Sequence, residues 1–174
     1  IEQSTRHKAL CPCDRQTKLD HPVASKLLGT AEDSGYFYLM TELYEGGELF
    51  DRLIERGQQS EADVAQVLRQ VLELVAHCHS MGIVHRDLKP ENIIFRTRSD
   101  VVGTHASELR IAVIDFGVAD TFVPGQFMTA WAGSPHYMAP EVIAGRYTQS
   151  AELWTVGVIL YTMLSAKMPF NGSN

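Results

Sequence analysis

The chain has 174 residues, of which 45% are hydrophobic, and carries 15 Lys and Arg against 21 Asp and Glu, a net charge of −6. This length allows one domain of ordinary size, and the apolar fraction excludes a wholly disordered chain. The negative charge argues against a protein that binds nucleic acid by broad phosphate neutralisation. Three cysteines, an odd number, give no disulfide framework and are typical of a reducing compartment, so we expect the cytoplasm, with the nucleus as the alternative.

The chain begins with Ile1 rather than Met, and no apolar run follows that would serve as a signal peptide. We therefore expect a fragment or a processed product. The longest apolar stretch runs from Leu153 to Leu164, about half of the ~20 residues that a membrane span needs. It predicts a buried helix and no membrane span.

The first predicted element is a hairpin. Residues 1–20 are polar and show neither a helical nor an alternating period, so no element is assigned there. Two short, apolar, β-prone segments follow, Ser25 to Thr30 and Tyr36 to Leu43, and residues 32–35 between them have turn composition.

Two helices are predicted next. Residues 48–56 place apolar side chains at helical spacing and are closed by Gly57. The longer helix begins at Ser60, where Asp63 three positions later resembles a capping box, and ends at Gly82. Its apolar stripe consists of Val64, Val67, Leu68, Val71, Val75 and Cys78.

A second strand pair and a last helix complete the predicted elements. The strands run from Ile93 to Phe95 and from Leu109 to Ile114, joined by a polar loop. Residues 150–166 are apolar on all faces, which is typical of a helix buried at the centre of a domain.

Three motifs occur in chain order. They read His-Arg-Asp-Leu-Lys-Pro-Glu-Asn at 85–92, Asp-Phe-Gly at 115–117 and Ala-Pro-Glu at 139–141. Alone, an Asp after an apolar strand is more often a turn residue or a helix cap. The order of all three motifs argues against that interpretation.

The motifs carry the groups that phosphoryl transfer needs. That reaction requires hard oxygen ligands for metal ions and a carboxylate that orients the attacking hydroxyl. Asp87, Asn92 and Asp115 supply such groups, and Lys89 lies on the same loop as Asp87. Because Asn92 precedes a strand and Asp115 follows one, two rigid elements can bring both to a single metal site.

With these motifs the chain resembles the eukaryotic protein kinases from about His21 to the end. Lys89 and the run Gly-Ser-Pro-His-Tyr at 133–137 are similar to the serine/threonine branch. Segments 45–52 and 165–170 are similar to the calcium/calmodulin-dependent group, and resemble plant calcium-dependent protein kinases and their relatives in particular.

The resemblance implies an α+β, protein-kinase-like fold. Most of it would be the helical C-lobe, at 44–174, with a remnant of the β-rich N-lobe at 21–43 and an unassigned segment at 1–20. No Gly-x-Gly-x-x-Gly and no Val-Ala-Ile-Lys precede the motifs. At the other end the sequence stops after the predicted helix at 150–166, without the later arginine that pairs with Glu141 in the family, so we expect a domain truncated at both ends.

The resemblance also implies an activity: transfer of the γ-phosphoryl group of ATP to Ser or Thr of protein substrates, with Mg²⁺. Asp87 would orient the hydroxyl, and Lys89 would neutralise the transferring group. Asn92 and Asp115 would hold the metal. The alternative is a non-catalytic kinase-like interaction module.

Further positions acquire roles by the same resemblance. Thr41 corresponds to the gatekeeper, and Glu42-Leu43-Tyr44 to the hinge that pairs with adenine. Glu48 would meet the ribose and, with Glu91, a basic residue upstream of the acceptor. From the residues alone, Glu42, Glu45 and Glu48 are equally a solvated acidic edge near a helix start.

The activation segment and substrate pocket are the last regions that the resemblance covers. Trp131, Pro135 and Met138 match the pocket for the residue after the acceptor, and their other interpretation is core packing. Ala130 stands where the family often has a phosphorylated residue, which leaves Thr129 as the nearest hydroxyl.

One position departs from the family pattern. Glu152 replaces the usual Asp, and we expect its extra methylene to displace the hydrogen bonds that brace the catalytic loop. At the N-terminus, His7, Cys11, Cys13 and His21 suggest zinc only weakly, because Cys-x-Cys is not the usual ligand spacing. We also expect poor solubility, because with few strands left above the hinge the large lobe exposes apolar surface that should contact the small lobe.

Overall fold

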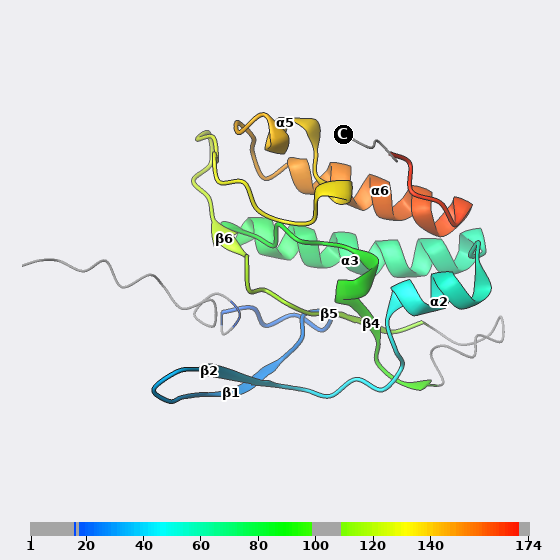
Figure 1. Cartoon of the computed structure of the whole chain (residues 1–174), viewed down its shortest axis with the longest axis horizontal. Helices are drawn as coiled ribbons and strands as arrows, with labels where there is room; N and C mark the ends of the chain where they lie inside the picture. Colours follow the sequence, from blue (N-terminus) through cyan, green and yellow to red (C-terminus); the bar gives the residue numbers. More distant parts are fainter. Residues whose placement is uncertain (1–15, 17, 99–108, 171–174) are drawn as a thin grey trace, which may run out of the picture.

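Two long helices, α3 (Glu61–Ser80) and α6 (Ala151–Ser165), lie side by side and pack against each other (Figure 1). The structure is a computed structural model that describes residues 16, 18–98 and 109–170. The shorter helix α2 (Leu49–Arg56) lies near one end of this pair, and the hairpin of β1 (Leu27–Glu32) and β2 (Phe37–Thr41) lies on the far side of β4 and β5. This mixture of helices and short strands agrees with the predicted α+β, protein-kinase-like fold.

The predicted hairpin forms, with its first strand shifted by two residues. β1 and β2 pair antiparallel from Leu27 opposite Thr41 to Glu32 opposite Phe37. Asp33 Oδ1 accepts the N–H groups of the two turn residues Gly35 and Tyr36, each at 2.8 Å. The strand starts late because the preceding residues pair elsewhere: Ser25 N–H donates to Val113 O on β5 over 2.9 Å.

Helix α3 begins as its sequence predicts, with one difference at the cap. Ser60 Oγ accepts the N–H of Asp63 at 3.1 Å. The Asp63 carboxylate does not complete the capping box, because it pairs with the buried Arg52 of α2 at 2.8 Å. The predicted apolar stripe is buried throughout and includes one more residue, Leu74.

Three two-stranded sheets form within the described residues. β3 (Ile83–Val84) pairs with β6 (Asp120–Thr121), and β4 (Ile93–Phe95) pairs with β5 (Ile111–Val113), as the sequence predicts for the second pair. Two 3₁₀ turns, η1 (Pro90–Asn92) and η2 (Pro135–Tyr137), and the short helix α5 (Pro140–Ile143) complete the element order. The core joins the faces of α2, α3 and α6 to β4 and β5.

The prediction that the last helix is buried on all faces is wrong. One face of α6 packs on α3 and on the 3₁₀ turn η2, and residues such as Val156 and Ile159 are buried there. On the other face Leu153 and Tyr161 are 53% and 49% exposed. Trp154 stacks on Phe170 with ring centroids 5.5 Å apart, which covers that face only in part. Among the described helices, none combines the length and the hydropathy needed to cross a membrane.

Candidate active site

The segment from the end of β3 to the end of η1 brings three predicted catalytic residues together. Asp87 Oδ2 lies 3.0 Å from Lys89 Nζ. Asn92 Nδ2 donates to the backbone O of Asp87 at 2.8 Å and approaches its carboxylate at 3.4 Å. Lys89 Nζ also donates to Ser134 Oγ at 2.9 Å, so the lysine joins the catalytic loop to the segment after Gly133.

Asp87 is held as a carboxylate. Burial alone would raise its pKa, but the polar groups of Ser134 and the charge of Lys89 outweigh this, and the pKa of Asp87 is lowered. Its Oδ1 atom is buried and has no hydrogen-bond partner among the described residues. A buried, unsatisfied carboxylate oxygen is costly, so Oδ1 retains the capacity to accept a hydrogen bond.

Asp115 is joined to this loop through the β4–β5 pair. In the register of that pair Ile93 lies opposite Val113, and Ile114 N–H donates to Asn92 O at 2.9 Å. The start of one strand and the end of the other therefore meet, as the sequence predicts. Asp115 has φ 60°, an uncommon value for a residue other than glycine, and its Oδ1 accepts Gly117 N–H at 3.1 Å.

His85 and Phe116 pack between these two segments. Their ring centroids lie 4.6 Å apart. His85 Nε2 lies 3.1 Å from Ile114 O, and burial lowers the pKa of His85. A neutral imidazole at this place donates one hydrogen bond to a carbonyl and packs its face on an aromatic ring.

A cavity of about 340 Å³ opens beside Asp115. Its wall contains the predicted gatekeeper Thr41 and the predicted hinge, together with Phe116 and Gly117. The volume is within the range of small-molecule sites. The hinge residues on its wall are Glu42, Leu43 and Tyr44.

Two predicted binding residues lie outside that cavity. Glu48 is the N-cap of α2, and its side chain makes no capping hydrogen bond. Glu91 lies in η1 with a buried Oε2 atom that has no partner among the described residues. The structure therefore places Thr41, the hinge and Asp115 on the wall of one cavity. Asp87, Lys89 and Asn92 lie together on the catalytic loop, which contacts the residue before Asp115 through Asn92.

The three residues predicted to form the pocket for the residue after the acceptor differ in their exposure. Trp131 is 64% exposed, and Pro135 is exposed as well. Met138 is buried in a small cluster with Val142 and Tyr147, which agrees with core packing.

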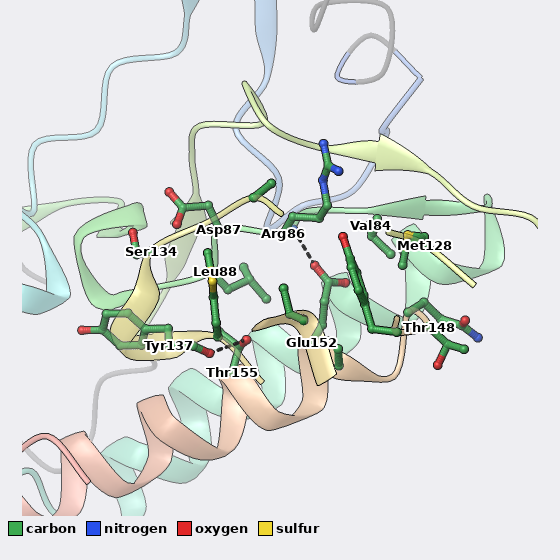
Figure 2. A pocket seen from close by; sticks show the side chains of 16 residues that line it. Val84, Arg86, Asp87, Leu88, Met128, Ser134, Tyr137, Thr148, Glu152 and Thr155 are labelled. Carbon is green, nitrogen blue, oxygen red and sulfur yellow. Dashed lines mark hydrogen bonds between the residues drawn. The ribbon is translucent and has the colours of Figure 1, made fainter. Parts of the chain in front are cut away.

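A second cavity, drawn in Figure 2, lies between the catalytic loop and α6. Its volume of about 30 Å³ has room for a water molecule and not for a nucleotide. Glu152 reaches from α6 toward Arg86 along its wall (Figure 2).

The expectation that Glu152 displaces the brace of the catalytic loop is wrong. Its Oε1 accepts the backbone N–H groups of His85 at 2.7 Å and Arg86 at 2.9 Å. Its Oε2 lies 2.6 Å from His79 Nε2 on α3. The longer side chain reaches both partners, so one buried carboxylate links α3, α6 and the catalytic loop.

Two residues of this site acquire a role that the sequence analysis did not give them. Ser134 accepts from Lys89, and Gly133 brings the chain against Arg86. A Cβ atom at Gly133 would lie 2.3 Å from Arg86 O, and its φ of 107° suits glycine alone. The sequence signal for both is the Gly133-Ser134 pair, which lies between the Asp-Phe-Gly and Ala-Pro-Glu motifs in the run that resembles the serine/threonine branch.

The donor set suits a hard divalent cation at Asn92 and Asp115. Both offer oxygen atoms, which Mg²⁺ prefers, and Asp115 borders the open cavity. In the described part of the chain no three His, Cys, Asp or Glu side chains cluster as a ready metal centre. Of the weak zinc set, His7, Cys11 and Cys13 lie outside the described residues, and His21 packs on His77.

Comparison with known proteins agrees with this geometry. The model of the protein kinase domain matches residues 2–174. Calcium-dependent protein kinase 5 of Oryza sativa subsp. japonica is 46% identical over 142 residues, which is 82% of this chain and 25% of that protein. Calcium-dependent protein kinase 4 of Plasmodium berghei (strain Anka) is 42% identical over 156 residues, 90% of this chain and 28% of that protein.

A third relative gives the same result. Calcium-dependent protein kinase 4 of Arabidopsis thaliana is 41% identical over 151 residues, 87% of this chain and 29% of that protein. The chain thus spans about a quarter of the length of these relatives. The resemblance read from the three ordered motifs is confirmed, and the chain belongs to the protein kinase domain family.

Proposed function

We propose that this chain is the catalytic region of a serine/threonine protein kinase that transfers the γ-phosphoryl group of ATP to protein substrates. The observation that carries the proposal is the contact between the catalytic loop and the segment that leads to Asp115. Asn92 donates to Asp87 O at 2.8 Å and accepts through its backbone from Ile114, the residue before Asp115. Membership of the protein kinase family supports the same reaction.

ATP would bind in the cavity of about 340 Å³. Backbone groups of Glu42 and Tyr44 would pair with adenine, and Thr41 would limit the depth of the site. Glu48, at the start of α2, would meet the ribose. Asp115 on the wall of the same cavity would then face the phosphates.

Mg²⁺ would be held by Asn92 and Asp115. When bound, it offsets negative charge on the phosphate oxygens. Asp87 would accept a hydrogen bond from the substrate hydroxyl through its carboxylate and so orient that hydroxyl. Lys89 would place a positive charge beside the transferring group while it remains near Asp87.

The substrates would be proteins with a basic residue upstream of the acceptor Ser or Thr. The support is a pair of carboxylates close to the catalytic loop: Glu91 lies in η1, and Glu48 forms an isolated backbone bridge with Ile94, two residues after Asn92. Glu91 Oε2 has no hydrogen-bond partner among the described residues, so this carboxylate retains the capacity to accept a hydrogen bond from a basic group. We assign residues 21–43 to the small lobe and 44–174 to the large lobe, and propose the cytoplasm, or else the nucleus, as the location.

The test is phosphoryl transfer by the full 174-residue chain from MgATP to a basic peptide that contains serine. Asp87→Ala should lower the rate by about 10²- to 10⁴-fold, because a positioned base typically contributes that much. Asp51→Ala removes an exposed carboxylate from α2 and serves as the matched control, with an unchanged rate. Nucleotide binding without any transfer, in the wild-type chain and both variants, would instead indicate a non-catalytic interaction module.

A further inference from the structure

Arg86 is held in place by three separate contacts. It lies directly before Asp87 and has φ 70°, a left-handed value that a residue with a side chain seldom adopts. Glu152 accepts its backbone N–H at 2.9 Å. Its side chain points the other way, where Nε donates to Val118 O at 2.7 Å and NH1 lies 3.3 Å from Asp120 Oδ2.

Asp120 is fixed by its place in β6. The antiparallel pairing of β3 with β6 puts Asp120 opposite Val84, two residues before Arg86. Its Oδ1 accepts the N–H of Thr121 at 2.9 Å, which leaves Oδ2 for the guanidinium. The backbone pairing with β3 therefore sets the position of Asp120 independently of its side-chain contacts.

The ion pair of Arg86 with Asp120 is partly buried. The Arg86 side chain is 13% exposed, while that of Asp120 is 35% exposed. A guanidinium with so little access to water needs a partner for its charge. The Asp120 carboxylate and the Val118 carbonyl supply it from within the chain.

An added phosphate commonly orders a loop by pairing with an arginine. Here Nε and NH1 of Arg86 already have partners, and one of these is an anion. Thr129 is an exposed hydroxyl on the segment that follows β6, and the next residue, Ala130, has none. The segment thus offers a hydroxyl for modification, but the cation that would receive the phosphate is engaged.

We propose that Asp120 is a positioning residue that holds the catalytic loop through Arg86, so that activity does not depend on a phosphate added after β6. This inference rests on the proposed kinase function. Asp120 touches neither the nucleotide nor the substrate in this scheme. It acts by keeping Arg86, and with it the adjacent Asp87, in one conformation.

The first test compares four variants of the full chain in transfer from MgATP to the basic peptide. Asp120→Asn keeps the shape and removes the charge, and should lower kcat by about 2- to 5-fold with an unchanged KM for ATP. Asp120→Glu should restore most of the lost rate. Thr129→Ala, and Glu55→Gln as an exposed control for the change in net charge, should match the wild type. An Asp120→Asn enzyme as fast as the wild type, or loss of activity in Thr129→Ala, would overturn the inference.

A second measurement does not require activity. Hydrogen exchange of the Arg86 amide should be several-fold faster in Asp120→Asn than in the wild type, and close to the wild type in Asp120→Glu. Equal exchange in all three proteins would refute the positioning role even if phosphoryl transfer is observed. Conversely, faster exchange in Asp120→Asn together with no transfer by the wild type would refute the kinase proposal and leave the role of Asp120 intact.

Discussion

Glu152 Oε1 accepts the backbone N–H of His85 over 2.7 Å, so a side chain from α6 fixes the first residue of the catalytic loop. The same carboxylate accepts from Arg86 and lies 2.6 Å from His79. It is 6% exposed, and hydrogen bonds to a charged group contribute more than those between neutral groups. The loop that carries Asp87 is therefore anchored to both long helices by one side chain.

Removing this carboxylate should destabilise the protein. Glu152→Ala leaves two buried N–H groups without an acceptor and should lower the free energy of unfolding by about 3 kcal/mol. Glu152→Asp should cost less, because the shorter side chain can still reach one of its two sets of partners. Urea denaturation of the three proteins measures the difference. Equal stability of the Ala variant and the wild type would show that the brace contributes nothing.

His21 should make stability depend on pH near neutrality. Burial and then the neighbouring His77 lower its pKa from 6.5, while the charge of Glu73 opposes this. The folded state binds a proton at His21 less readily than the unfolded chain does. The contribution of His21 to the free energy of unfolding is therefore fully present above pH 6.5 and is lost as the pH falls below that value. In the wild type, Val23 N–H donates to His21 Nδ1 at 3.2 Å. His21→Asn keeps an acceptor for this N–H and removes the group that titrates near neutrality.

The measurement for His21 is the urea midpoint between pH 5.5 and 7.5. The wild-type midpoint should fall toward pH 5.5, and the slope should be smaller in the Asn variant. Parallel curves for the two proteins would be inconsistent with a titration at His21.

Gly133 should tolerate no side chain. In Gly133→Ala the new Cβ would meet Arg86 O at 2.3 Å, so either the catalytic loop or the segment at Ser134 must move. Gly125 has a similar left-handed φ of 83° but no atom within 4 Å of a Cβ, so Gly125→Ala is a matched control for the backbone cost alone. We expect Gly133→Ala to lose about 1 to 3 kcal/mol more stability than Gly125→Ala. Equal losses, measured by thermal unfolding, would argue against the close contact.

The uncovered face of α6 should cause self-association of the isolated chain. Leu153 and Tyr161 are 53% and 49% exposed on that face. Replacing both by lysine should reduce the aggregated fraction in size-exclusion chromatography and change the free energy of unfolding by only about 0.5 kcal/mol per site. Ile159→Ala, at a fully buried position of the same helix, should instead cost about 2 to 5 kcal/mol and leave the aggregation in place.

The elements that the sequence predicted well are those in which local pattern and tertiary packing agree. The α3 stripe is buried because its apolar residues recur at helical spacing. Asn92 and Asp115 meet because one precedes β4 and the other follows β5, and antiparallel pairing brings those ends together. In both cases a short-range signal was sufficient.

What the sequence missed depends on long-range geometry. Composition cannot tell which face of α6 a neighbour covers, so the apolar sequence predicts burial on all sides. The reach of Glu152 depends on the distance between α6 and the loop, and that distance suits the longer side chain. The contact of Lys89 with Ser134 joins residues 45 apart in the chain, and no local pattern predicts it.

The sharpest test is a calorimetric titration of the full chain with ATP, with and without Mg²⁺. If Asn92 and Asp115 hold the metal beside the nucleotide, Mg²⁺ should tighten binding in the wild type, and Asp115→Asn should reduce this gain by about tenfold or more. Asp51→Asn, which changes an exposed carboxylate on α2, should retain it in full. An Asp115→Asn protein with the same Mg²⁺-dependent gain as the wild type would contradict the convergence of these residues on one metal-bound triphosphate.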